Sequence, residues 1–161
     1  LSIRYSLENT PLGTGGALKQ AESLLEDSFL LQYGDTYLDI DYKKFVEAFY
    51  NGDYTGLIAA YVNKDVIAAN NLKVDACNAV ISYNKRSPEA MTHLDSGVMA
   101  FKKEILDLIE PGTTCSLEEE VYEKLINKGQ LKAYPINNRF YDMGTFEGLK
   151  LLEELLSDND N

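Results

Sequence analysis

The stretch that most constrains this chain runs from Ser28 to Asp39 and reads SFLLQYGDTYLD. It is apolar at first and then breaks at Gly34 into Asp35. A short apolar run that ends in turn residues is typical of a buried strand. Ligands of open α/β sheets bind beyond the carboxyl ends of the strands. We therefore expect Asp35 to hold a divalent metal against phosphates, the alternative being a plain strand-to-loop turn with a solvated aspartate.

Length and charge limit the class of protein. The chain has 161 residues, enough for one domain with a sizeable core, and is 45% hydrophobic and 25% charged. No apolar run is long enough to cross a bilayer, so we expect a cytoplasmic protein with no membrane partner. The net charge of -11 argues against a nucleic-acid surface. Cys77 and Cys115 have neither metal nor redox spacing and are expected to be free thiols.

A glycine-rich segment near the start has the pattern of a ligand-binding loop. Glu8 to Leu18 reads ENTPLGTGGAL, and a helical period begins behind it. The amino end of a helix offers free N–H groups and positive dipole, and glycines let a ligand approach the backbone closely. A nucleotide base or ribose is one candidate ligand, and simple helix capping is the alternative.

The rest of the chain alternates between strand and helix patterns. Such alternation favours an α/β sheet with helices on both faces. We assign the Ser116–Lys128 helix a packing role and expect a polar tail over 157–161. The expected strands are Ile3–Leu7, Thr55–Val62, Asp95–Phe101 and Leu131–Ile136, with a hairpin of arms Leu72–Ala76 and Ala79–Tyr83; the expected helices are Asp41–Tyr50, Lys102–Ile109, Ser116–Lys128 and Phe146–Leu156.

Three further side chains are candidates for chemistry. Asp142 follows the aromatic pair Phe140-Tyr141 and precedes a helix, which repeats the arrangement around Asp35. Lys85 ends the second arm of the hairpin and is a candidate phosphate ligand, although most lysines are simply solvated. His93 is the single histidine and has no neighbour at catalytic spacing, so we assign it no proton-transfer role.

Five segments together resemble one family, the sugar-phosphate nucleotidyltransferases, also called nucleotide-sugar pyrophosphorylases. They occur in the family's order, cover nearly the whole chain, and are most similar to guanylyltransferases for mannose or heptose 1-phosphates. The segments are PLGTGGAL (Pro11–Leu18), LLQYGDTYLDID (Leu30–Asp41), ISYNK (Ile81–Lys85), HLDSGVMAFKKEIL (His93–Leu106) and RFYDMGTFEGL (Arg139–Leu149).

The resemblance implies a Rossmann-like α/β fold, an open and mostly parallel sheet with helices on both faces. It implies that Asp35 and Asp142 bind Mg²⁺ and that Lys85 contacts the sugar phosphate. Many relatives have Glu-Lys where this chain has Asn84-Lys85, and Asn or Thr at Asp95, which points to altered sugar recognition. The residues expected at the nucleotide are Leu12, Gly13, Thr14 and Gly16, and those expected at the sugar are Asn84, Asp95 and Gly97.

One family signature has no match in the sequence. Relatives begin with a strand, a Gly-Gly-x-Gly-Thr-Arg loop around the triphosphate, and a downstream Pro-Lys. We therefore expect residues 1–156 to be the C-terminal portion of a catalytic domain that lacks its first strand or strands, and to be inactive alone. Such a piece would expose a sheet edge, so a homo-oligomer is possible.

The resemblance implies the reaction NTP plus sugar 1-phosphate giving NDP-sugar plus pyrophosphate. The second pKa of a phosphate ester is about 6, so the nucleophile is already ionised at neutral pH and needs no general base. Positioning and charge neutralisation would then carry the catalysis. Two alternatives remain open: a non-catalytic domain that binds a nucleotide sugar or regulates a partner, and a cytidylyltransferase for a phospho-alcohol.

Overall fold

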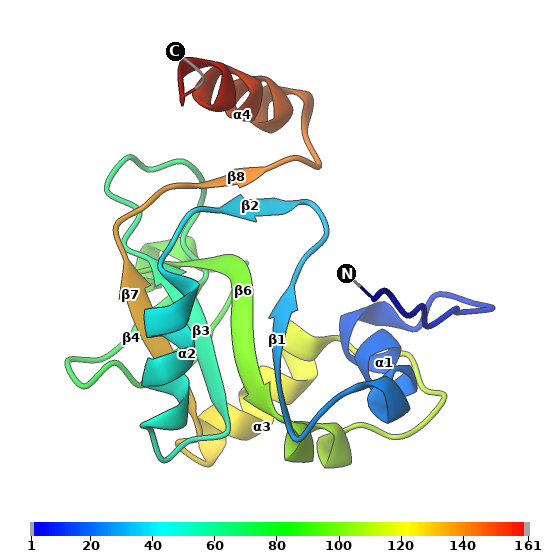
Figure 1. Cartoon of the computed structure of the whole chain (residues 1–161). Helices are drawn as coiled ribbons and strands as arrows, with labels where there is room; N and C mark the ends of the chain where they lie inside the picture. The colour runs from blue at the N-terminus through cyan, green and yellow to red at the C-terminus, as the bar shows by residue number, and fades with distance from the viewer. Residues whose placement is uncertain (1, 160–161) are drawn as a thin grey trace.

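A computed structural model describes residues 2–159 and has a four-stranded central sheet (Figure 1). The strand order is β1 (Ser28–Gln32), β6 (Leu94–Lys102), β3 (Gly56–Tyr61) and β7 (Leu131–Ile136). Strand β6 is antiparallel to both β1 and β3, whereas β3 and β7 are parallel. The expected α/β fold is confirmed.

The expectation of a mostly parallel sheet is wrong for the described strands. The chain leaves β3 at Tyr61 and reaches β6 through the hairpin of β4 (Leu72–Val74) and β5 (Val80–Tyr83). A helical crossover would have returned the chain to the starting end of β3, as parallel strands require. The hairpin does not, so β6 begins opposite the end of β3, with Leu94 paired to Tyr61.

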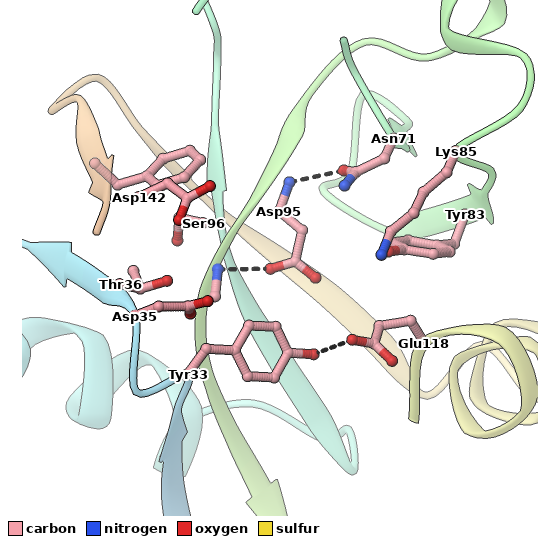
Figure 2. A pocket seen from close by; sticks show the side chains of 12 residues that line it. Tyr33, Asp35, Thr36, Asn71, Tyr83, Lys85, Asp95, Ser96, Glu118 and Asp142 are labelled. Carbon is pink, nitrogen blue, oxygen red and sulfur yellow. Dashed lines mark hydrogen bonds between the residues drawn. The ribbon is translucent and has the colours of Figure 1, made fainter. Parts of the chain in front are cut away.

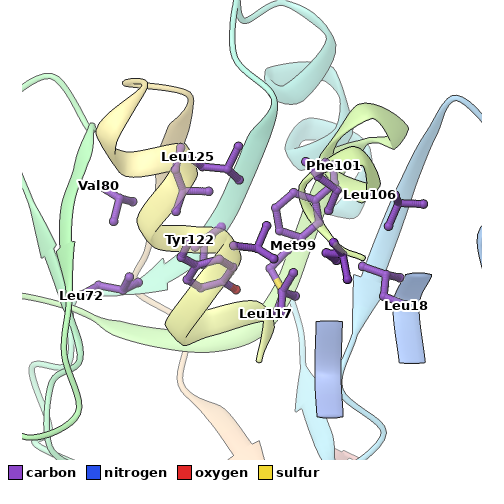
Figure 3. Close-up of a cluster of buried hydrophobic side chains, with 14 of the residues drawn as sticks. Leu18, Leu72, Val80, Met99, Phe101, Leu106, Leu117, Tyr122 and Leu125 are labelled. Atoms are coloured by element: carbon purple, nitrogen blue, oxygen red, sulfur yellow. The ribbon is translucent and has the colours of Figure 1, made fainter. Parts of the chain in front are cut away.

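Helices cover both faces of the sheet, as expected. Strand residues alternate between the faces, so Met99 and Phe101 of β6 lie in one core and Val98 and Ala100 in the other. The first core packs against helix residues such as Tyr122 (Figure 3). The second packs mainly against α2 (Tyr42–Tyr50) through Phe45 and Phe49. Burying a large apolar side chain contributes about 1.5–3 kcal/mol, so the two cores hold β6 and β3 at the centre.

The best-defined helical pattern, Ser116–Lys128, forms two pieces. A π-helical turn, η4 (Leu117–Val121), leads into the α-helix α3 (Tyr122–Asn127). Ser116 caps the start, because its Oγ accepts a hydrogen bond from the Glu119 N–H at 3.1 Å. In a capping box the third residue after the cap, here Glu119, accepts a bond from the N–H of the cap. In this helix Ser116 N–H donates instead to Glu120 Oε1, at 2.9 Å.

Other sequence expectations have mixed outcomes. Ile3–Leu7 was expected to be a strand but has no regular structure, and Ile3, Tyr5 and Leu7 are exposed. An alternating pattern forms a strand when its apolar side chains pack on a core and its backbone pairs with another strand. Among the described residues this segment has neither a core contact nor a partner strand. The expected helix at Lys102–Ile109 is the 3₁₀ segment η3 (Lys103–Leu108).

No helix in the described range is both long and apolar enough to cross a membrane.

A second, two-stranded sheet lies beside the carboxyl end of β1. Strand β2 (Thr36–Leu38) pairs antiparallel with β8 (Phe140–Asp142), so Thr36 faces Asp142. The chain then enters α4 (Phe146–Asn159), above this small sheet in Figure 1. Helix α4 continues into the segment expected to be a polar tail, and residues 160–161 lie outside the described part.

The glycine-rich segment begins α1 (Gly13–Gln20), which packs against the loop before η4. Gly15 N–H and Gly16 N–H both donate to the Cys115 carbonyl oxygen, at 2.9 and 3.3 Å. A Cβ on Gly16 would lie 2.5 Å from the Thr113 carbonyl oxygen. The glycine therefore permits close contact between two segments of the protein itself.

We predict that Gly16→Ala destabilises the protein by about 1–3 kcal/mol, because the added methyl group overlaps backbone that cannot easily move. Gly34→Ala is the matched control, since nothing lies within 4 Å of its Cβ position. Urea unfolding of both variants measures the difference. Equal stability of the two variants would contradict the packing role.

Candidate functional site

A cavity of ≈ 210 Å³ opens where β1 and β8 end and β6 begins, and we call it the acidic pocket (Figure 2). Its lining includes the carboxylates of Asp35, Asp95, Glu118 and Asp142, and among the described residues a single cation, Lys85. These five residues come from five separate parts of the chain. An anionic ligand could occupy such a pocket once part of this negative charge is neutralised.

The structure brings Asp35 and Asp142 together. The pairing of β2 with β8 places Asp142 opposite Thr36, and Met143 N–H donates to the Asp35 carbonyl oxygen at 2.7 Å. A Cβ built on Gly144 would lie 3.0 Å from Asp142 Oδ1 and 3.2 Å from Asp35 Oδ2. The two carboxylates therefore face one small volume that the absence of a side chain at Gly144 leaves open.

This volume fits a hard divalent cation. Carboxylate oxygens are the ligands that Mg²⁺ prefers, and the ion is commonly held by one or two carboxylates with phosphates and waters completing the shell. Within the described residues, no group of three or more His, Cys, Asp or Glu is arranged to hold a metal. A site at Asp35 and Asp142 would thus need ligands from a bound substrate.

The residues expected near the sugar occupy different positions. Lys85 lines the acidic pocket, with its Nζ 5.8 Å from the centroid of the Tyr83 ring. Asn84 is not among the lining residues, and its Oδ1 instead accepts from the Arg86 N–H at 2.7 Å. Gly97 lines the pocket at φ +75°, and a Cβ there would lie 2.7 Å from Thr36 Oγ1. Gly97 therefore lets β6 and β2 approach closely.

Asp95 is half-buried in the wall of the acidic pocket and forms no ion pair among the described residues. Its Oδ1 accepts from Gly97 N–H at 2.9 Å, and its Oδ2 from the Tyr122 hydroxyl at 3.3 Å. Burial raises the pKa of the Asp95 carboxyl to about 6, although these hydrogen bonds and Lys85 oppose the rise. Asp95 is therefore ionised at neutral pH at a cost to the folded state.

Glu118 is a site residue that sequence reasoning missed, because its helix was assigned to packing. Its carboxylate is buried and accepts hydrogen bonds from the hydroxyls of Thr14 (2.7 Å), Ser116 (3.0 Å) and Tyr33. Burial alone would raise the pKa of Glu118, but the hydrogen bonds hold it below its ordinary value. The signal that could have found it is an acidic residue on the apolar side of the helix.

The residues expected at the nucleotide are not part of the acidic pocket. Leu12, Gly13, Thr14 and Gly16 lie at the start of α1 and are absent from its lining. Thr14 is nevertheless linked to it, because its hydroxyl donates to Glu118 and accepts from Leu117 N–H at 2.9 Å. Glu118 thus joins the glycine-rich segment to Tyr33 in the pocket wall.

Comparisons with known proteins found relatives of this chain in sequence and in structure. The sequence model of one family, described as Nucleotidyl transferase, matches residues 1–158. A D-glycero-alpha-D-manno-heptose 1-phosphate guanylyltransferase of Campylobacter jejuni is 29% identical over 91% of this chain and 64% of its own length. A mannose-1-phosphate guanylyltransferase of Mycobacterium tuberculosis is 28% identical over 91% of this chain and 42% of its own. The chain therefore spans about two fifths to two thirds of these relatives.

Solved structures of similar fold were also found. HddC from Yersinia pseudotuberculosis, solved in complex with GMP-PN, has a TM-score of 0.75 and 31% identity over 92% of this chain and 64% of that one. A putative glucose-1-phosphate thymidylyltransferase from Bacillus anthracis has a TM-score of 0.82, covering 96% of this chain and 65% of that one. Its identity is 16%, so it supports the Rossmann-like α/β fold alone.

We predict that Asp95→Asn stabilises the protein more at pH 7.5 than at pH 4. The folded pKa of about 6 exceeds the ordinary 3.8, so the folded state binds the proton more tightly and loses stability as pH rises between these values. Asparagine does not titrate, so its advantage should grow by about 2 kcal/mol between pH 4 and pH 7.5. Urea unfolding of both proteins at both pH values measures the change; a pH-independent difference would contradict a raised pKa.

We also predict that Glu118→Gln lowers the free energy of unfolding by about 1–3 kcal/mol, because an amide cannot accept all three hydroxyl protons. Glu119→Gln is the matched control, since this exposed neighbour accepts none of these bonds. Thermal or urea unfolding compares the two variants. An unchanged stability in Glu118→Gln would argue against the three-hydroxyl cluster.

Proposed function

Because the chain belongs to the nucleotidyl transferase family, we propose that the protein transfers a nucleotidyl group from an NTP to a sugar 1-phosphate. The products are an NDP-sugar and pyrophosphate. The convergence of Asp35 and Asp142 on the open volume beside Gly144 carries this proposal. Asp35 and Asp142 reach it from segments far apart in sequence, which simple turn capping does not require.

Asp35 and Asp142 would hold Mg²⁺ in this proposal. When bound, Mg²⁺ neutralises phosphate charge and orients the reacting groups. The chain's own residues supply the remaining positioning. Lys85 lines the same pocket and would neutralise part of the charge on the sugar phosphate. No histidine is required, because the phosphate nucleophile is already ionised.

The pocket wall would recognise the sugar. Asp95 and Gly97 line it on the β6 side, and Tyr33 lies beside them. Burial, Asp95 and the hydrogen bond to Glu118 raise the pKa of the Tyr33 hydroxyl far above its ordinary range, so it remains protonated. The half-buried Asp95 carboxylate accepts hydrogen bonds, which suits donation by sugar hydroxyls.

We further propose that the nucleotide donor carries guanine and that the sugar is of the mannose type. The support comes from the relatives named as heptose and mannose 1-phosphate guanylyltransferases, at 29% and 28% identity. The nucleotide would contact Leu12, Gly13 and Thr14 at the start of α1, whereas Gly16, also expected there, is buried against the backbone of Thr113 and Cys115. A non-catalytic binding domain is less well supported, because it would not need both aspartates and Lys85 around one cavity.

The cytoplasmic location, the homo-oligomer and the 1–156 domain boundary stay predictions.

We predict that Asp35→Asn or Asp142→Asn lowers the turnover of the full-length protein by orders of magnitude without unfolding it. The amide removes the negative charge that holds the cation at the reacting phosphates. Pyrophosphate release from GTP and mannose 1-phosphate, measured against Mg²⁺ concentration, gives the rate. Asp53→Asn is the control, because Asp53 is exposed and outside the pocket. Near-normal Mg²⁺-dependent turnover in either variant would overturn the assignment.

A further inference from the structure

A second cavity, of ≈ 450 Å³, lies between β8 and α4; we call it the Arg139 pocket. Apolar side chains form much of its wall, including Ile67, Leu94, Phe140 and Leu151. Cavities of roughly 300–1,000 Å³ with apolar walls and a few polar groups are typical of small-molecule sites. The proposed reaction uses the acidic pocket and leaves this one unexplained.

Arg139 is the unusual group in this cavity. Its Nε is buried, yet it has no hydrogen-bond partner within the described residues, and the side chain makes no ion pair there. Its guanidinium carbon lies 5.4 Å from the centroid of the Tyr141 ring, which orients the group. A buried donor without a partner costs about 1–3 kcal/mol. A ligand anion would remove that cost.

The other charged groups near Arg139 are directed elsewhere. Asp142 Oδ1 accepts from Gly144 N–H at 2.9 Å and faces the volume shared with Asp35. Glu147 lines the cavity but is exposed. Asp65, on the adjoining loop, accepts from the Tyr61 hydroxyl at 3.0 Å. The first turn of α4 also lines the cavity, and its dipole adds positive potential.

We propose that the Arg139 pocket is a second ligand site that takes an organic phosphate monoester. The guanidinium fork would pair with the phosphate oxygens, because it matches their geometry with two parallel N–H donors. The body of the ligand would lie against Phe140 and the aliphatic wall. A nucleotide and a sugar phosphate share this chemistry, and both have a body of suitable size.

The site shares a wall with the acidic pocket. Phe140 and Asp142 line both cavities. A ligand beside Arg139 would therefore press on the strand that carries Asp142. The proposal nevertheless does not depend on catalysis, because binding beside Arg139 requires neither metal nor turnover.

The test is NMR of the ¹⁵N-labelled protein without divalent metal, titrated separately with GMP and with mannose 1-phosphate. The signals of Arg139 Nε–H and Gly148 N–H report on the Arg139 pocket, and those of Thr36 and Gly97 report on the acidic pocket. We expect at least one of the two phosphates to shift the first pair at millimolar concentration. Which one does so identifies the source of the phosphate. Guanosine and mannose, which lack the anion, should bind about tenfold more weakly or not at all.

Variants make the test specific. Arg139→Gln should weaken binding about tenfold or more, and Arg139→Lys, which keeps the charge but loses the fork, should lie between. Arg4→Gln removes the same charge from an exposed position and should bind like the parent. Asp35→Asn should also keep this binding, which separates the proposal from the proposed reaction. The proposal is overturned if neither phosphate binds, if shifts are confined to Thr36 and Gly97, or if Arg139→Gln binds normally.

Discussion

The antiparallel pairing of β2 with β8 is the interaction on which the rest of the site depends. It places Asp142 opposite Thr36, adds the bond from Met143 N–H to the Asp35 carbonyl, and so brings together two carboxylates more than a hundred residues apart. The central sheet supplies the rigid base, since β3 is buried along its whole length. A rigid sheet with a short two-stranded sheet attached to it would suit the anion binding proposed for this site.

Much of this arrangement could be predicted from the sequence, because local residue patterns indicate where most of the strands and helices lie. The apolar run before Gly34 predicted strand β1 and its polar end, but β1 is an edge strand of half-buried and exposed residues and not the buried strand expected. The short strand β8 was not predicted, although Asp142 was singled out at the end of its aromatic pair. The helices expected to begin at Asp41 and Ser116 do so, and the structure shows both residues capping the first turn. The convergence of Asp35 with Asp142 and Lys85 followed from the resemblance, since spacing alone cannot join distant strand ends.

What escaped prediction depended on contacts between distant segments. The direction of β6 is set by a hairpin in place of a crossover, and both produce the same apolar pattern. Ile3–Leu7 alternates correctly but has no partner strand. Glu118 reaches Tyr33 because a π-helical turn precedes α3, and a regular helical period does not encode such a turn. The glycines of α1 were expected to admit a ligand, but Gly16 admits neighbouring backbone.

The excess of carboxylates in the acidic pocket has a kinetic consequence. An incoming phosphate meets four acidic side chains and Lys85, on a protein whose overall charge is -11. Long-range repulsion between the phosphate and the carboxylates slows such an encounter. Dissolved salt weakens this repulsion at separations beyond roughly 10 Å when the ionic strength is 0.1 M. The association rate of a phosphate ligand with the metal-free pocket should therefore rise as salt is added, the reverse of an enzyme that steers its substrate by attraction.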